Sequence, residues 1–236
     1  MRAILLMMLL TAWGLADTPD ELYSQANDAY LKGAYSRSAE LYRKSLEAGE
    51  SGEVLYNLGN AYYQLEDLGR ARVAYEKARL YRPRDRNLTH NLALLRSKLS
   101  DTEPPEDGLT RLVRLATENE LAGAVLFFNL ATVMLVLLYR RQGREALAWG
   151  AVASLVVLLL LVALLSWKEL GPGAHRAVVV SALAQVKNGP GREFTDSLTL
   201  HSGTAVTVLD ERGDWFAILA LGRIQGWVRR EQVETI

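Results

Sequence analysis

Three histidines are the residues of this sequence best suited to bind a metal ion or to transfer protons. His90, His175 and His201 are far apart in the chain, and none has a second ligand three or four residues away, as a zinc site on a helix needs. The sequence has no cysteine, which excludes thiolate metal sites, a cysteine nucleophile and a disulfide framework. We therefore expect no metal site.

Other catalytic patterns are missing as well. The sequence contains no phosphate-binding loop, no Gly-x-Ser-x-Gly elbow and no dinucleotide fingerprint. The acid pairs Glu66-Asp67 and Glu106-Asp107 fall on an expected turn and in an expected linker, where a solvated charge is the ordinary role. We predict no catalytic residues, no cofactor and a protein that is not an enzyme.

The distribution of charge is more informative than its total. The 27 lysine and arginine residues balance 27 aspartate and glutamate residues, so the chain lacks the basic surface on which nucleic-acid binding depends. Two blocks carry no formal charge at all, residues 121–139 and 146–167, and they flank the arginine-rich stretch RRQGRE at 140–145.

Both uncharged blocks are long enough to cross a membrane. At 1.5 Å per residue they reach about 28 and 33 Å, against a hydrocarbon core of about 30 Å. Tyr139, Trp149 and Trp167 lie near their ends, where aromatic rings favour the membrane interface. We predict two transmembrane helices, with Asn129 as a strongly polar side chain in the middle of the first, able to hydrogen-bond to another helix.

The first residues predict export. Residues 1–16 have a positive charge at Arg2, an apolar core, and the small residues Gly14 and Ala16 before the expected cleavage site. This is the layout of a cleaved signal peptide. Cleavage places residue 17 outside the cytoplasm.

The first span then runs inward and the second returns outward. Arg140, Arg141 and Arg144 in the connecting loop agree with this orientation, because positive charge favours the cytoplasmic side. We predict that loop 140–145 is cytoplasmic and that both water-soluble parts lie on the opposite side.

Residues 52–85 resemble a tetratricopeptide repeat. Counting Gly52 as position 1, the signature positions 7, 8, 11, 20, 24, 27 and 32 are occupied by Leu58, Gly59, Tyr62, Ala71, Tyr75, Ala78 and Pro83. A weaker repeat covers about residues 19–51, where Ser38 and Ser45 replace the usual alanines, and a closing helix is expected over 86–99. We predict an all-α domain over 17–100, whose short stack a partner could complete.

The repeat resemblance implies an extended peptide bound in a concave groove. The family's groove positions map onto Tyr23, Asn27, Tyr30, Tyr56, Asn60, Tyr63, Gln64, His90 and Lys98. Asn27 and Asn60 could hydrogen-bond an extended backbone, while the tyrosines supply rigid contact area. Asn87 and Asn91 stand where the family's carboxylate clamp has basic residues, which disfavours recognition of a free C-terminus. The alternative is that many of the tyrosines are packing residues.

Residues 101–120 predict a linker and a juxtamembrane segment. Pro104 and Pro105 with acidic neighbours indicate the linker, and a second linker is expected over 168–176. Within residues 101–120, after the first linker, four apolar residues have helical spacing: Leu109, Leu112, Val113 and Ala116. A helix on the membrane surface and an ordinary helical extension both fit them.

The last part of the chain, residues 177–236, changes to short β-rich runs. The alternation in AVTVL and FAILA and the turn at 188–191 predict a small antiparallel β-barrel. The segment GTAVTVL at 203–209, followed by Trp215 and by GWV at 226–228, resembles bacterial Src-homology-3-like domains.

Relatives of that domain bind cell-wall peptides or protein segments. The resemblance therefore makes Trp215, Phe216 and Trp227 a candidate aromatic groove for a ligand. The alternative is that Phe216 or Trp227 faces the core of the barrel, because successive residues of a strand point to opposite faces.

The order of these parts is itself informative. It is similar to the BatE proteins of Bacteroides aerotolerance operons, most closely in YNLGNAYYQLEDLGRARVAYEKARLYRPRD and HNLALLRSKL. The resemblance implies a bacterial inner-membrane protein with periplasmic domains, working with von Willebrand factor A-domain proteins and a MoxR-type ATPase in envelope stress or aerotolerance. We expect a non-enzymatic scaffold that docks partner proteins; the alternative is an envelope sensor whose barrel binds peptidoglycan peptide.

Overall fold

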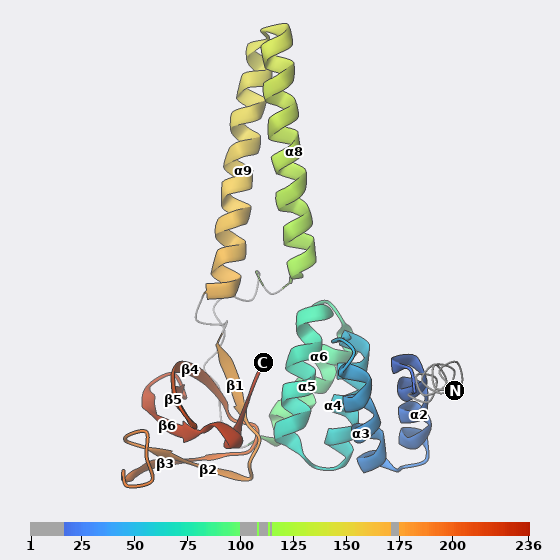
Figure 1. Ribbon diagram of the computed structural model, residues 1–236, viewed down its shortest axis with the longest axis vertical. Coiled ribbons are helices and arrows are strands. Elements are labelled where there is room, and N and C mark those ends of the chain that lie inside the picture. Colours follow the sequence, from blue (N-terminus) through green and yellow to red (C-terminus); the bar gives the residue numbers. More distant parts are fainter. Residues whose placement is uncertain (1–16, 100–107, 109–112, 114, 171–174) are drawn as a thin grey trace, which may run out of the picture.

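The computed structural model describes residues 17–99, 108, 113, 115–170 and 175–236. Within these ranges the chain forms a helical unit, a long two-helix hairpin and an antiparallel β-sheet (Figure 1). This confirms the multidomain architecture predicted from the sequence. The predicted signal peptide over 1–16 and most of the segment 101–120, with the predicted juxtamembrane helix, lie outside the described residues.

The helical unit consists of two antiparallel helix pairs and a closing helix. Its members are α2 (Pro19–Leu31), α3 (Tyr35–Leu46), α4 (Gly52–Gln64), α5 (Leu68–Tyr81) and α6 (Arg86–Lys98). Side chains that accept hydrogen bonds cap the N-termini of three of these helices. Thr18 forms a capping box with Glu21 at the start of α2, and Asp67 and Asp85 cap α5 and α6. Each cap satisfies backbone N–H groups that the first helical turn leaves without partners.

Small residues bring the paired helices close together. A Cβ at Gly59 in α4 would lie 2.5 Å from the ring of Tyr75 in α5, so only glycine allows this ring to pack against the α4 backbone. Ala71 and Ala78 in α5 are fully buried as well. The repeat signature is therefore a packing requirement at these positions.

The hairpin consists of α8 (Glu118–Gln142) and α9 (Glu145–Leu170). Both helices are long and apolar enough to cross a membrane, and only 6% and 11% of their most apolar windows are buried within the molecule. The helices extend beyond the two uncharged blocks, so the loop expected over 140–145 is reduced to Gly143 and Arg144. Gly143 ends α8 with a φ of 65°, a left-handed conformation that glycine adopts without strain.

Polar contacts join the two helices to each other and to the helical unit. Thr132 Oγ1 and Ser154 Oγ lie 2.9 Å apart, and Ser154 also donates to the backbone carbonyl of Phe128 at 3.2 Å. At the base of the hairpin, Arg84 forms two hydrogen bonds with the Glu120 carboxylate, at 3.0 and 2.9 Å. The α5–α6 corner therefore lies beside the beginning of α8.

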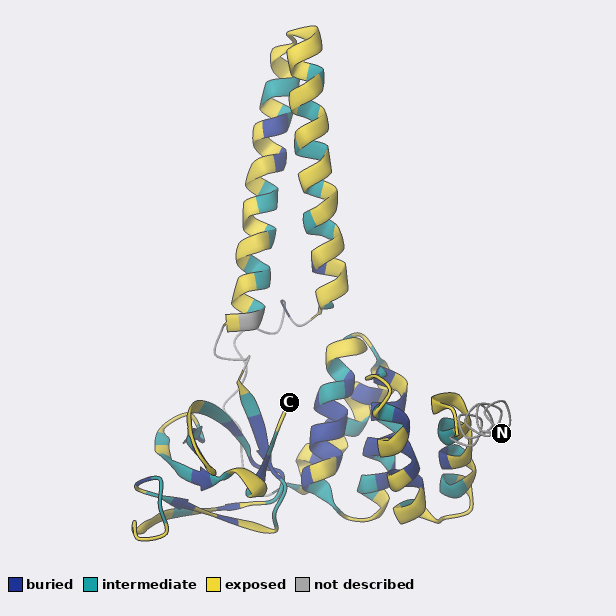
Figure 2. Ribbon diagram, in the orientation of Figure 1, coloured by how far each residue is buried: buried dark blue, intermediate teal, exposed yellow. Residues whose placement is uncertain are grey.

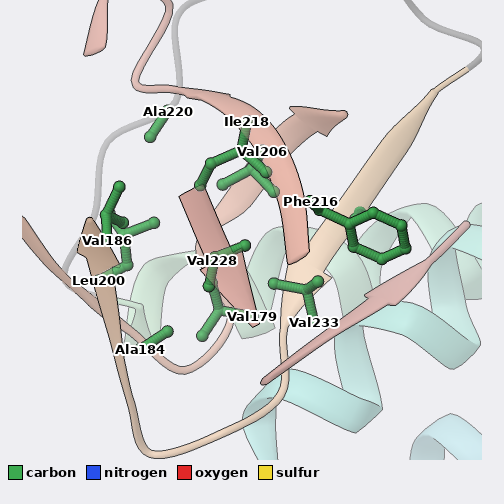
Figure 3. Packing of buried hydrophobic residues seen from close by; sticks show 11 residues of the cluster. Val179, Ala184, Val186, Leu200, Val206, Phe216, Ile218, Ala220, Val228 and Val233 are labelled. Carbon is green, nitrogen blue, oxygen red and sulfur yellow. The ribbon is translucent and has the colours of Figure 1, made fainter. Parts of the chain in front are cut away.

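Residues 176–235 form one seven-stranded antiparallel sheet in the order β3-β2-β6-β5-β4-β1-β7. The strands are β1 (Arg176–Val179), β2 (Leu183–Lys187), β3 (Asp196–His201), β4 (Ala205–Arg212), β5 (Trp215–Ala220), β6 (Ile224–Arg229) and β7 (Val233–Thr235). The sheet curves around a core of alternate residues from its strands, among them Val186, Ile218 and Val228 (Figure 3). Each of these three side chains is fully buried.

The sheet packs directly on α5. A Cβ at Gly69 would lie 2.7 Å from the backbone carbonyl oxygen of Val179 in β1, so the two backbones nearly touch. Arg72 in the middle of α5 is only 1% exposed. The chain's own sheet therefore covers a face of the helical stack that the sequence left open for a partner.

Candidate functional site

The nine groove residues expected from the repeat resemblance lie on alternate helices. Tyr23, Asn27 and Tyr30 belong to α2; Tyr56, Asn60, Tyr63 and Gln64 to α4; His90 and Lys98 to α6. None of the nine is buried, and the sheet packs on α5 instead. We call these nine residues the tyrosine–asparagine face (Figure 2 shows how exposure varies along these helices).

Each repeat holds its groove asparagine in the same way. The hydroxyl of Tyr42 in α3 donates a hydrogen bond of 2.5 Å to Asn27 Oδ1, and the hydroxyl of Tyr75 in α5 donates one of 2.7 Å to Asn60 Oδ1. The two asparagines are 33 residues apart in the chain, and so are the two tyrosines. The two bonds are therefore repeats of one structural device.

Both tyrosines are protonated and donate, and burial moves their titration further from neutral pH. Burial raises the pKa of Tyr42 to about 12 and raises the pKa of Tyr75 still further. Asn27 and Asn60 accept these bonds through Oδ1, so their Nδ2 groups are the donors of the face. A side-chain hydrogen bond of Asn27 with Tyr23 also lowers the pKa of Tyr23, against the larger effect of burial, which raises it. The Nδ2 donors fit the carbonyl oxygens of an extended peptide.

A second set of asparagines links neighbouring helices across this face. Asn57 Nδ2 donates to the Tyr23 hydroxyl at 3.0 Å, and Asn91 Nδ2 donates to Tyr56 at 3.1 Å and to Asn60 Oδ1 at 3.0 Å. Asn91, which stands where the family's clamp has a basic residue, is therefore a bridge between α6 and α4.

The two ends of the face differ in charge. Near the beginning of α2 and α4, Tyr23 donates a 2.7 Å hydrogen bond to Glu53, and a hollow of about 410 Å³ there is lined by Asp20, Glu50 and Glu53 among others. Toward α6, the Lys98 ammonium lies 4.3 Å from the centre of the Tyr63 ring. The face therefore presents acidic groups at one end and a basic group at the other.

Sequence reasoning missed the residues that orient this face: Tyr42, Glu53, Asn57, Tyr75 and Asn91. The sequence identifies Tyr75 only as a signature position of the repeat, and Asn91 only as a departure from the family's carboxylate clamp. The signal that could have found Tyr42 and Tyr75 is the 33-residue repetition that they share with Asn27 and Asn60. No comparable spacing points to Glu53.

The aromatic residues of the sheet do not form the groove expected from the sequence. Phe216 is only 5% exposed and belongs to the core, and Figure 3 shows its ring among the core side chains. Trp215 and Trp227 lie on the other face of the sheet, because Trp215 alternates with Phe216 along β5 and Trp227 pairs with Ala217. The three aromatic rings therefore cannot share one surface.

Trp215 instead lines a separate hollow of about 440 Å³. Its other lining residues are charged: Arg192, Asp214, Arg229, Arg230 and Glu231. Trp227 is outside this lining, and the Arg212 guanidinium lies 5.2 Å from the centre of its ring. Two of the three arginines already form ion pairs, Arg229 with Glu231 and Arg230 with Glu211. The hollow therefore combines an aromatic ring with mostly paired charges, and Arg192 is the arginine of the lining outside these two ion pairs.

Comparisons with known proteins find the repeat and little else. The tetratricopeptide repeat family model matches residues 52–85, which are α4, α5 and the turn after α5. The chain is also 28% identical over 93 residues to the general transcriptional corepressor trfA of Dictyostelium discoideum, a match that covers 38% of this chain and 7% of that protein. The chain thus contains a tetratricopeptide repeat at residues 52–85.

Proposed function

We propose that this protein is a non-enzymatic membrane scaffold that holds an extended segment of a partner protein on the tyrosine–asparagine face. The observation that carries the proposal is the repeated orientation of Asn27 and Asn60 by buried tyrosines. A tetratricopeptide repeat suggests protein–protein interaction in general, and these two amides supply a specific way to bind a peptide backbone. The partner segment is expected to place a basic end near Glu53 and an acidic end near Lys98.

The membrane location is part of the proposal. Two helices of sufficient length and apolarity support it, and the arginines of the connecting loop favour a cytoplasmic hairpin tip. Both the helical unit and the sheet then lie on the periplasmic side of a bacterial inner membrane. The BatE resemblance suggests membrane proteins with A domains and a MoxR-type ATPase as the partners, in envelope stress or aerotolerance.

Co-purification from the native cell tests the docking role. The tagged full chain is extracted in mild detergent, and the proteins that accompany it are compared with those of the double variant Asn27→Ala, Asn60→Ala. We expect the variant to lose a partner that the wild type retains. Asn119→Ala is the matched control, since Asn119 is an exposed asparagine near the start of α8, away from the face. Equal recovery with all three chains contradicts the proposal.

Reporter fusions test the orientation. Alkaline phosphatase is active only outside the cytoplasm, so fusions after Leu99 and Ile236 should be active and a fusion after Gly143 inactive. Activity at Gly143, or its absence at either other site, overturns the periplasmic placement.

The Trp215 hollow favours a second candidate function, an envelope sensor that binds peptidoglycan peptide. Peptide stems carry carboxylates that arginines can pair with, and Arg192, Arg229 and Arg230 line the hollow with Trp215. A bound carboxylate would replace Glu231 or Glu211 as the partner of Arg229 or Arg230. The test is retention of the detergent-solubilised full chain on purified cell wall. Retention that disappears in Trp215→Ala supports the sensor, and a chain that is never retained removes it.

A further inference from the structure

Asn129 lies on the outside of the hairpin. It is near the middle of α8, and its side chain is exposed in the described structure. The hydrogen bonds between α8 and α9 run through Thr132 and Ser154 instead. The sequence left open whether Asn129 joins the two spans, and its exposure shows that it does not.

An exposed amide is unusual at this depth. If the hairpin spans a membrane, as proposed above, Asn129 faces hydrocarbon, where no water can satisfy its two N–H donors and its carbonyl acceptor. Threonine and serine can donate to a carbonyl of their own helix, as Thr132 does to Phe128 at 2.8 Å. An amide also needs a donor for its oxygen, and another helix is the usual source.

We propose that Asn129 pairs with Asn129 of a second copy of this chain, within a parallel helix–helix contact in the membrane. The amide is complementary to itself, since each copy offers the donor that the other's oxygen requires. A two-fold axis along the membrane normal gives two reciprocal hydrogen bonds from a single contact. A unique polar residue in an apolar helix contact also sets the register of the two helices.

The neighbours of Asn129 form a stripe suited to this contact. Ala122, Leu126, Asn129, Val133 and Val136 are spaced by four, three, four and three residues and are all exposed. This is the 3.5-residue period at which two helices stay in contact along their length. All copies insert with the same orientation, so every residue of the stripe meets its own counterpart. Figure 2 shows that most of α8 is exposed.

The absence of native cysteine makes the contact directly measurable. Val133 and Met134 are adjacent, and their side chains are 51% and 58% exposed, but at about 100° per residue they point in different directions. Val133 belongs to the stripe and Met134 does not. Single variants Val133→Cys and Met134→Cys in the full chain are oxidised in native membranes with copper phenanthroline, and the covalent dimer is measured on a non-reducing gel.

We expect Val133→Cys to form a dimer several-fold faster than Met134→Cys. Adding Asn129→Leu to Val133→Cys should weaken dimerisation roughly 3- to 30-fold, the range found for interhelical hydrogen bonds in membranes. Asn129→Gln, which keeps the amide, should retain much of the cross-linking. Together these results separate the amide pair from a purely apolar contact.

Three outcomes overturn the inference. Equal cross-linking at the two positions excludes the stripe, and cross-linking that Asn129→Leu leaves unchanged excludes the amide pair. In the third outcome, the Val133→Cys chain forms no disulfide but co-purifies with a different membrane protein, and Asn129→Leu abolishes that co-purification. Asn129 then pairs with that protein and not with a second copy. Carbonate extraction of the membranes separates this inference from the proposed membrane location. If carbonate releases the chain, both proposals are overturned. If the chain stays in the membrane but forms no covalent dimer, only the pairing with a second copy is overturned.

Discussion

The guanidinium of Arg72 in α5 donates a hydrogen bond of 2.6 Å from Nη1 to the backbone carbonyl oxygen of Gly203, which lies just before β4 and 131 residues later in the chain. One helical turn further, Glu76 is also only 1% exposed. Arginines from three elements approach its carboxylate: Arg79 at 2.5 Å, Arg96 of α6 at 2.9 Å and Arg176 of β1 at 3.8 Å. This buried charge cluster joins the helical unit to the sheet.

The stability of this junction should depend on acid pH through Glu76. Burial by itself raises the pKa of Glu76, but the charges of Arg79, Arg176, Arg96 and Arg72 outweigh burial and lower it to about 2 from 4.5. A lowered pKa in the folded state means that the stabilisation is complete above pH 4.5 and is lost as the pH falls toward 2. The loss amounts to about 3 kcal/mol.

The measurement is the thermal unfolding midpoint of the full chain in detergent between pH 6 and pH 2, with Glu76→Gln as the comparison. The variant should be less stable at pH 6, because four arginines then lack their carboxylate, and should lose less stability on acidification. A wild type and a variant that lose stability in parallel contradict the role of Glu76.

Arg72→Met should destabilise the protein by about 1–3 kcal/mol, because the buried carbonyl of Gly203 loses its donor and Glu76 loses one of its positive neighbours. Arg70→Met is the matched control on the same helix. Arg70 forms an exposed ion pair with Asp67 at 2.9 Å, and such pairs contribute about 1 kcal/mol or less. Unfolding of both variants in detergent provides the comparison, and equal effects count against the Arg72–Gly203 contact.

Gly69→Ala should separate α5 from the sheet. The added Cβ meets the Ser202 hydroxyl at 2.5 Å and the Val179 carbonyl oxygen at 2.7 Å, and a backbone oxygen cannot move aside without displacing β1. We expect a cost of about 1–3 kcal/mol and faster hydrogen exchange in β1. Gly123→Ala in α8, whose added Cβ meets nothing within 4 Å, should leave exchange in β1 unchanged. Normal protection of β1 in Gly69→Ala refutes the close backbone approach.

Phe216 and Trp215 should respond in opposite ways to truncation. Phe216→Ala empties part of the sheet core and is expected to cost about 3–5 kcal/mol. Trp215→Ala removes a side chain of the outer face and should change stability by much less, while altering any binding at the hollow that it lines. Thermal unfolding of both variants, with cell-wall retention as a second readout, checks this contrast.

Much of the fold is predictable from local pattern. The spacing of small residues such as Gly59 and the two uncharged blocks are readable in the sequence, because each depends on neighbours within a few turns or on the thickness of a bilayer. The orientation of Asn27 and Asn60 was within reach too, since Tyr42 and Tyr75 repeat at the same spacing. Asp67, expected as a solvated charge on a turn, is instead the N-cap of α5.

The remaining features depend on groups that are distant in the chain. Arg72 and Glu76 look like ordinary solvated charges of a repeat helix, and only the sheet that packs on α5 buries them and supplies Arg176 and the carbonyl of Gly203. The side of the sheet on which Phe216 falls depends on how β5 pairs with its neighbours, and a shift of one residue would exchange it with Trp215. Residue types and short spacings thus determined the elements and their order; only tertiary packing decided which charges are buried, which aromatic ring is core and which amide of the hairpin faces outward, because burial depends on what lies opposite a side chain in space.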